Sequence, residues 1–178
     1  GMTVLKPGKS CGAGVPGVRE PGILFRGIAA VVQVPEGLQL AIDGMGKFLD
    51  GVDFDLVAGT ESRGFVFGAP IARDMKKGFV LIRKKGKLPR KTICQEYDLE
   101  YGTSAVEIHV DAVKPGQKVV LVDDLMATGG TIEASIKMIE RLGGQVVKVI
   151  FLMELAGLKG RERLKDYDVD SVIIYPGN

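Results

Sequence analysis

Residues 119–131 are Val119-Val120-Leu121-Val122-Asp123-Asp124-Leu125-Met126-Ala127-Thr128-Gly129-Gly130-Thr131. The four leading apolar residues, three of them β-branched, are typical of a strand inside a parallel sheet. Asp123 and Asp124 stand where we expect that strand to end, and ligands of open α/β sheets bind outside the carboxyl ends of strands. The segment therefore predicts a buried strand, an acidic pair facing a ligand, and a turn into a helix.

The loop from Thr128 to Thr131 would bring backbone N–H groups and two hydroxyls to the start of that helix. A helix N-terminus attracts phosphate, and glycines let the backbone approach the anion closely. Carboxylates for sugar hydroxyls beside a phosphate cradle suggest a phosphorylated ribose. Aspartates that only cap the helix are the alternative. A P-loop is disfavoured because no Gly-Lys-Thr or Gly-Lys-Ser follows the glycines.

The rest of the chain alternates predicted strands with predicted helices. Hydrophobic patterns predict strands over 55–59, 78–83, 106–110, 146–153 and 172–175, and helices over 38–49, 64–75 and 132–142. This alternation indicates an α/β fold with a parallel twisted sheet flanked by helices. We expect an irregular N-terminal segment over 1–37 and one core domain over 38–178. Residues 84–104 are polar and are predicted to form a loop without regular structure.

Composition narrows the possible functions. The chain has 178 residues, is 46% hydrophobic and carries a net charge of +2, which does not favour bulk binding to nucleic acid or membranes. No apolar run is long enough to span a membrane, and we expect no secretory signal, because the first residues lack an apolar core. Cys11 and Cys94 form neither a disulfide framework nor a metal-binding spacing, so a cytoplasmic location is expected.

The segment 119–131 resembles the binding signature of type I phosphoribosyltransferases, which use 5-phosphoribosyl-1-pyrophosphate. The resemblance implies their fold, with a small N-terminal hood and a mobile lid loop. It also implies that Asp123 and Asp124 bind the ribose hydroxyls. The loop that would hold the 5′-phosphate consists of Ala127, Thr128, Gly129, Gly130 and Thr131.

Two further segments resemble the diphosphate-binding parts of this family's adenine enzymes. In Gly59-Thr60-Glu61-Ser62-Arg63-Gly64-Phe65, the resemblance implies diphosphate contacts from Arg63 and from the amides of Glu61 and Ser62. In Leu81-Ile82-Arg83-Lys84-Lys85-Gly86-Lys87-Leu88-Pro89, it implies contacts from Arg83, Lys84 and Lys87. Four cations in five residues repel one another unless anions compensate them. The alternative for the first segment is a simple strand-to-helix turn with a surface arginine, and the alternative for the second is a solvated surface.

The segment Tyr97-Asp98-Leu99-Glu100-Tyr101-Gly102 resembles the family's lid, a loop of about residues 84–104 here. By that resemblance Glu100 is the acid–base residue near the purine, with Tyr101 beside it. Arg63 and Lys87 would complete the catalytic residues. A lid would exclude water from an oxocarbenium-like centre. An ordinary exposed glutamate is the alternative.

Base binding is implied at two places. Pro21-Gly22-Ile23-Leu24-Phe25-Arg26 resembles the family's hood, in which Phe25 would stack on the purine and the backbone of Leu24 and Arg26 would read its edge. Leu158 would cover the other face of the base, or simply pack. The family usually has Asp where this chain has Gly27.

The resemblance implies transfer of the phosphoribosyl group to N9 of adenine, giving AMP and pyrophosphate in purine salvage. Mg²⁺ would be held mainly by the substrate rather than by protein residues, and the partners would be these small molecules and a second copy in a homodimer. One alternative is an enzyme for a 6-oxopurine such as hypoxanthine or xanthine. Gly27 bears on this alternative because it replaces the family's usual Asp in the part that selects the base. Another is a non-catalytic regulator that senses phosphoribosyl pyrophosphate.

Overall fold

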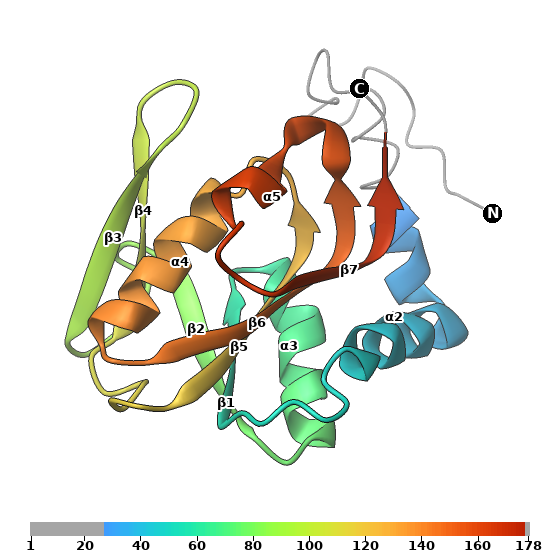
Figure 1. The fold of residues 1–178 in the computed structure, drawn as a ribbon, viewed down its shortest axis with the longest axis horizontal. Coiled ribbons are helices and arrows are strands. Elements are labelled where there is room, and N and C mark those ends of the chain that lie inside the picture. Colours follow the sequence, from blue (N-terminus) through green and yellow to red (C-terminus); the bar gives the residue numbers. More distant parts are fainter. Residues whose placement is uncertain (1–26, 177–178) are drawn as a thin grey trace.

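The computed structural model describes residues 27–176, which form one seven-stranded sheet with helices on both faces (Figure 1). The elements along the chain are α2 (Pro35–Lys47), β1 (Leu56–Thr60), α3 (Arg63–Asp74), β2 (Gly78–Lys84), β3 (Thr92–Asp98), β4 (Thr103–His109), β5 (Lys118–Met126), α4 (Gly130–Arg141), β6 (Gln145–Leu155), the 3₁₀ turn η1 (Ala156–Leu158), α5 (Gly160–Arg163) and β7 (Val169–Tyr175).

The strand order is β3-β4-β2-β1-β5-β6-β7. The five strands from β2 to β7 in this order run parallel, as the alternation of strands and helices predicts. β4 instead pairs antiparallel with β2 and with β3. The predicted parallel sheet is confirmed, and it carries an antiparallel hairpin at one edge.

The apolar run that opens β5 is buried because both faces of the sheet are covered. Val119 and Leu121 point into a core shared with α4, whereas Val120 and Val122 point into a core shared with α2 and α3. Successive residues of a strand face opposite sides, so burial on both sides requires a continuous apolar run. β5 is thereby fixed in the middle of the molecule, with its carboxyl end directed at the site described below.

Two expectations from the sequence were wrong. The segment predicted to be irregular, 1–37, is helical over 27–33 and again from Pro35, because Ile28 packs with α2 and α3; residues 1–26 lie outside the described part. Residues 84–104 are not a structureless loop, since 92–98 form β3. Seven cross-strand pairs, from Thr92 with His109 to Asp98 with Thr103, join β3 to β4.

Within residues 27–176, no helix is both long and apolar enough to cross a membrane.

Candidate functional site

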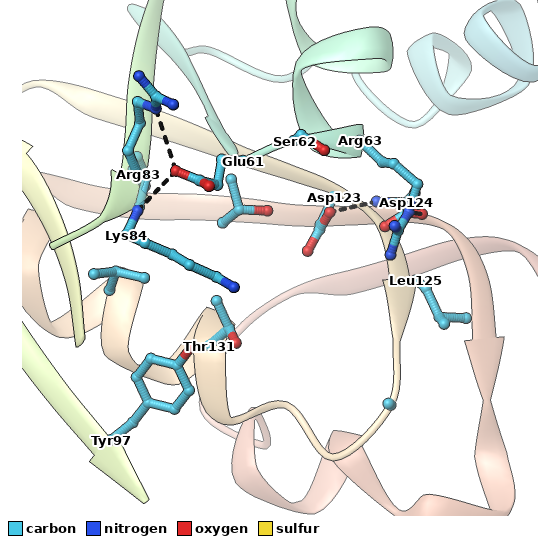
Figure 2. A pocket seen from close by; sticks show the side chains of 14 residues that line it. Glu61, Ser62, Arg63, Arg83, Lys84, Tyr97, Asp123, Asp124, Leu125 and Thr131 are labelled. Carbon is cyan, nitrogen blue, oxygen red and sulfur yellow. Dashed lines mark hydrogen bonds and ion pairs between the residues drawn. The ribbon is translucent and has the colours of Figure 1, made fainter. Parts of the chain in front are cut away.

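A cavity of about 410 Å³ lies at the carboxyl ends of β1, β2 and β5 (Figure 2). Parallel strands end at the same edge of a sheet, so the loops that follow them meet there. The lining residues are Thr60, Glu61, Ser62, Arg63, Ile82, Arg83, Lys84, Tyr97, Val106, Asp123, Asp124, Leu125, Ala127 and Thr131. The structure therefore brings residues of four sequence segments together around one space.

The acidic pair lies within β5 rather than after it, which corrects the expected strand end, because β5 continues to Met126 alongside β6. The Asp124 side chain is buried and forms an ion pair with Nε of Arg63. The backbone N–H of Asp124 donates to Oδ1 of Asp123 at 2.8 Å. Burial raises the pKa of Asp123 well above its usual range, and the neighbouring Asp124 carboxylate raises it further.

The loop after β5 meets α4 as the sequence predicts. Gly129 is the N-cap of α4 with a φ of 87°, a conformation that suits glycine, and its carbonyl accepts the N–H of Glu133. A Cβ at this position would also lie 3.2 Å from the carbonyl oxygen of Gly160. Ala127 and Thr131 line the cavity, so the N-terminus of α4 opens onto it.

Glu61 connects the loop after β1 to the end of β2. Its Oε1 accepts the backbone N–H of Lys84 at 2.9 Å and Nε of Arg83 at 3.2 Å (Figure 2). The Lys84 hydrogen bond is the main reason that the pKa of Glu61 lies below its ordinary value, and Arg83 adds to the effect. The Glu61 carboxylate thus compensates part of the positive charge of the basic run and reduces the repulsion among its cations.

The remaining residues that the sequence singles out are not among those lining the cavity. Thr128 and Lys87 are exposed, and Gly129 and Gly130 are buried at the start of α4. Glu100 and Tyr101 are exposed in the turn between β3 and β4, with Tyr101 86% exposed. Leu158 is 48% exposed in η1. The hood residues Leu24, Phe25 and Arg26 lie outside the described residues.

Sequence reasoning gave no role to several residues that the structure places at the cavity. Tyr97 reaches it from β3, and Val106 from β4. Tyr97 belongs to the segment that resembles the lid. The side of the sheet that its side chain faces is set by the pairing of β3 with β4, and the sequence of the segment alone does not show that pairing. Alternation along a strand would have shown which side Tyr97 faces, had β3 been recognised.

Gly64 allows α3 to begin close against β5. A Cβ on Gly64 would lie 2.9 Å from the carbonyl oxygen of Val122, 3.0 Å from Oγ1 of Thr60 and 3.3 Å from Oδ1 of Asp123. The carbonyl oxygen of Val122 belongs to the backbone of β5, so it cannot rotate away as the end of a flexible side chain could. The start of α3, which carries Arg63, would have to move away from the acidic pair to make room.

We therefore expect Gly64→Ala to destabilise the fold by about 1–3 kcal/mol, the usual cost of overpacking. It should also weaken binding at the cavity, because the Arg63–Asp124 pair would be displaced. Urea unfolding and calorimetric titration with Mg²⁺ and phosphoribosyl pyrophosphate measure the two effects. Gly46→Ala in α2 is the matched control, since a Cβ there meets nothing within 4 Å. An equally stable Gly64→Ala variant would show that the contact relaxes without cost.

Comparison with known proteins places these features in a family context. Residues 37–176 match the phosphoribosyl transferase domain. The chain is 60% identical over 163 residues to an adenine phosphoribosyltransferase of Agathobacter rectalis, covering 92% of this chain and 94% of that protein.

Solved structures agree with this relationship. The crystal structure of adenine phosphoribosyltransferase from Thermoanaerobacter pseudethanolicus superposes with a TM-score of 0.81 at 52% identity, covering 83% of this chain and 86% of that one. The Saccharomyces cerevisiae adenine phosphoribosyltransferase, solved with an imino-altritol bisphosphate and adenine, gives a TM-score of 0.76 at 36% identity, with 81% and 84% covered.

Proposed function

This chain belongs to the phosphoribosyl transferase family, and from that relationship we infer that it is an enzyme that transfers the phosphoribosyl group of phosphoribosyl pyrophosphate to N9 of adenine. The products are AMP and pyrophosphate, and the reaction is a step of purine salvage. Relatives at 53–63% identity over most of the chain are adenine phosphoribosyltransferases, as are the matching solved structures. The comparisons thus favour adenine over a 6-oxopurine.

The observation that carries the proposal is the meeting of an acidic pair and a helix N-terminus in one cavity. Asp123 and Asp124 offer oxygens to the ribose hydroxyls, and the start of α4 offers N–H groups to the 5′-phosphate. Arg63 and Lys84 lie at the same cavity and supply positive charge for the diphosphate. This order of charges along the cavity complements a ribose with a phosphate at one end and a diphosphate at the other.

Catalysis by these residues would rest on position and charge. The Arg63 guanidinium is held beside the sugar subsite by its ion pair with Asp124, so it lies at the junction of sugar and diphosphate. Neutralising the departing diphosphate lowers the barrier to cleavage of the C1–O bond, and a fixed ribose keeps C1 in line with the base. Glu100 would exchange a proton with the purine once the β3–β4 turn closes over it.

We also propose that Mg²⁺ accompanies the substrate. The site offers hard carboxylate oxygens at Asp123 and Asp124, a donor type that suits Mg²⁺. As the family resemblance implies, diphosphate and ribose oxygens with water would be its main ligands. The cation would neutralise charge on the leaving group.

Three further proposals follow the family resemblance. Leu24, Phe25, Arg26, Tyr101 and Leu158 would contact the base, the chain would act as a homodimer, and it would work in the cytoplasm. Sedimentation equilibrium would test the dimer. Neither a nucleic acid nor a membrane is needed as a partner in this scheme.

The decisive experiment offers adenine, hypoxanthine, guanine and xanthine separately with phosphoribosyl pyrophosphate and Mg²⁺, and measures the nucleotide formed. We expect AMP from adenine and at least about a hundredfold lower kcat/KM for the 6-oxopurines, since a site that hydrogen-bonds one base edge leaves polar groups unpaired with another. Turnover of a 6-oxopurine instead would overturn the adenine assignment. Tight binding of phosphoribosyl pyrophosphate without turnover of any base would favour a sensor.

A further inference from the structure

Glu107 is a buried carboxylate beneath the most basic segment of the chain. It lies on β4 and is only 4% exposed. The segment above it is the basic loop, defined as residues 85–91 between β2 and β3. A buried charge is costly unless it is paired or hydrogen-bonded, so the position of this carboxylate requires a compensating interaction.

The compensation comes from the backbone of the basic loop. The N–H of Leu88 donates to Oε1 of Glu107 at 2.7 Å, and Oγ1 of Thr92 lies 3.4 Å from Oε2. Burial by itself would raise the pKa of Glu107, but the backbone N–H groups of Leu88, Gly86 and Lys87 outweigh it and hold that pKa below its ordinary value. The loop backbone thus compensates the buried charge, and the Leu88 hydrogen bond ties the middle of the basic loop to β4.

Two neighbours of Glu107 attach the same loop. Nε2 of His109 lies 2.6 Å from the carbonyl oxygen of Pro89, and Arg90 pairs with Asp111 at 2.8 Å. Residues two apart on a strand face the same side, so Glu107 and His109 share the face on which the loop lies. Asp111, just after β4, extends this row of contacts. Three consecutive residues of the basic loop, Leu88 to Arg90, are thus each attached to β4 or to the residues just after it.

The basic loop is joined directly to the cavity. Arg83 of β2 pairs opposite Glu107 in the antiparallel ladder, and its Nη1 donates to the carbonyl of Lys87 at 3.3 Å. The N–H of Lys87 in turn donates to the carbonyl of Lys84, closing the turn at 3.2 Å. Arg83 and Lys84 line the cavity. The path of the loop backbone therefore determines where these cations stand.

We propose that Glu107 is a positioning residue for diphosphate binding: it fixes the backbone of the basic loop so that Arg83, Lys84 and Lys87 face the diphosphate. This inference rests on the proposed function of the cavity. Four cations within residues 83–87 repel one another, and a fixed internal anion offsets part of that repulsion. Glu107 acts through the loop and does not itself touch the substrate.

The test compares Glu107→Gln and Glu107→Ala with the wild-type chain by calorimetric titration with Mg²⁺-pyrophosphate and, separately, with AMP. Glutamine keeps one acceptor but loses the charge and turns an NH₂ group toward N–H donors. We expect the Kd for pyrophosphate to rise about tenfold in Glu107→Gln, the loss of roughly one charge-assisted hydrogen bond. The Kd for AMP, which has no diphosphate, should stay within about twofold.

Glu140→Gln is the matched control, the same chemical change at an exposed α4 carboxylate that accepts the Tyr167 hydroxyl. It should change neither Kd. Equal weakening of pyrophosphate and AMP binding by Glu107→Gln would overturn the proposal in favour of general structural support, and so would unchanged pyrophosphate binding. If Glu107→Ala does not fold, Glu107→Gln still decides. A wild-type chain that bound pyrophosphate but made no AMP would refute the proposed function and leave this comparison intact.

Discussion

Replacing Asp124 by Asn is expected to lower kcat/KM for phosphoribosyl pyrophosphate by about a hundredfold, equivalent to ~3 kcal/mol, because a buried charged hydrogen-bond partner is lost. The Asp124 side chain is 3% exposed and forms the ion pair with Arg63. The substitution therefore removes an acceptor for a ribose hydroxyl and releases the guanidinium that the site needs beside the sugar. Calorimetric titration with Mg²⁺ and phosphoribosyl pyrophosphate should show weaker binding, together with the kinetic loss.

The pH dependence of binding gives a second, independent measurement. Burial is the main cause of the raised pKa of Asp123, and the Asp124 charge is the next. A raised pKa means that Asp123 loses its charge on acidification earlier than an ordinary aspartate does, so binding that needs the carboxylate weakens as pH falls through that value. Asp124→Asn removes one cause, and the acidic limb of the binding profile should move to lower pH.

Asp53→Asn is the control for this change. Asp53 is an exposed aspartate that pairs with Lys118 at 2.7 Å, and surface ion pairs contribute little to stability. Substrate affinity in that variant should equal that of the wild-type chain. If Asp124→Asn bound phosphoribosyl pyrophosphate as tightly as Asp53→Asn does, the assignment of Asp124 to the sugar would be wrong.

The features predicted correctly are those whose determinants are close together in the sequence. Residues 119–142 contain an apolar run, then carboxylates, small residues and a helical pattern. The structure has β5, the loop and α4 in this segment, in that order. The start of α3 similarly follows the short apolar strand β1, after Glu61 and Ser62. Strand direction then follows from topology, because a helix between strands makes them parallel.

Strand β3 was missed because its stability comes from contacts with β4 and α4 rather than from the strand preference of its own residues. β3 contains Gln95, Glu96 and Asp98 among its seven residues, a polar composition with weak intrinsic preference for a strand. What fixes it is the antiparallel ladder with β4 and a hydrogen bond from Arg141 of α4 to the carbonyl of Cys94 at 2.7 Å. β4 follows after only the turn at 99–102, but Arg141 lies 47 residues from Cys94 in sequence, so the local pattern around β3 does not contain that contact.

Glu107 escaped notice for a related reason. Glu107 is a polar residue between Val106 and Ile108 in an alternating segment. Such alternation predicts that the charged side chain lies on the solvent-facing side of a strand. In the structure that side is covered by the basic loop, so the residue is buried. The contact between the Glu107 carboxylate and the basic loop is visible only in the folded structure, where residues 85–91 lie over β4.

The second large effect is expected at Glu100. Replacing it by Gln keeps the size of the side chain but abolishes proton exchange, and general acid–base catalysis contributes about a hundredfold or more. We therefore expect the rate of the chemical step to fall about a hundredfold while the KM for adenine changes little. Product release limits many enzymes, so the single-turnover rate should be measured beside kcat.

The position of Glu100 makes this prediction a test of movement as well as chemistry. Glu100 is exposed in the turn closed by the hydrogen bond from Leu99 to the carbonyl of Gly102, and it is not among the residues lining the cavity. Catalysis by this side chain requires the turn to close over the base. Because Tyr97 already reaches the cavity from the same hairpin, a modest bend of the two strands would carry the turn in that direction.

Glu96→Gln separates a specific role from the general loss of one negative charge on the hairpin. Glu96 is exposed on β3 next to Tyr97, and strand alternation turns it to the opposite side from the cavity. Its single-turnover rate should match the wild-type rate. A normal rate in Glu100→Gln as well would remove Glu100 from catalysis. The base's proton would then have to leave by another route, and closure of the turn would serve only to exclude water from the reacting C1.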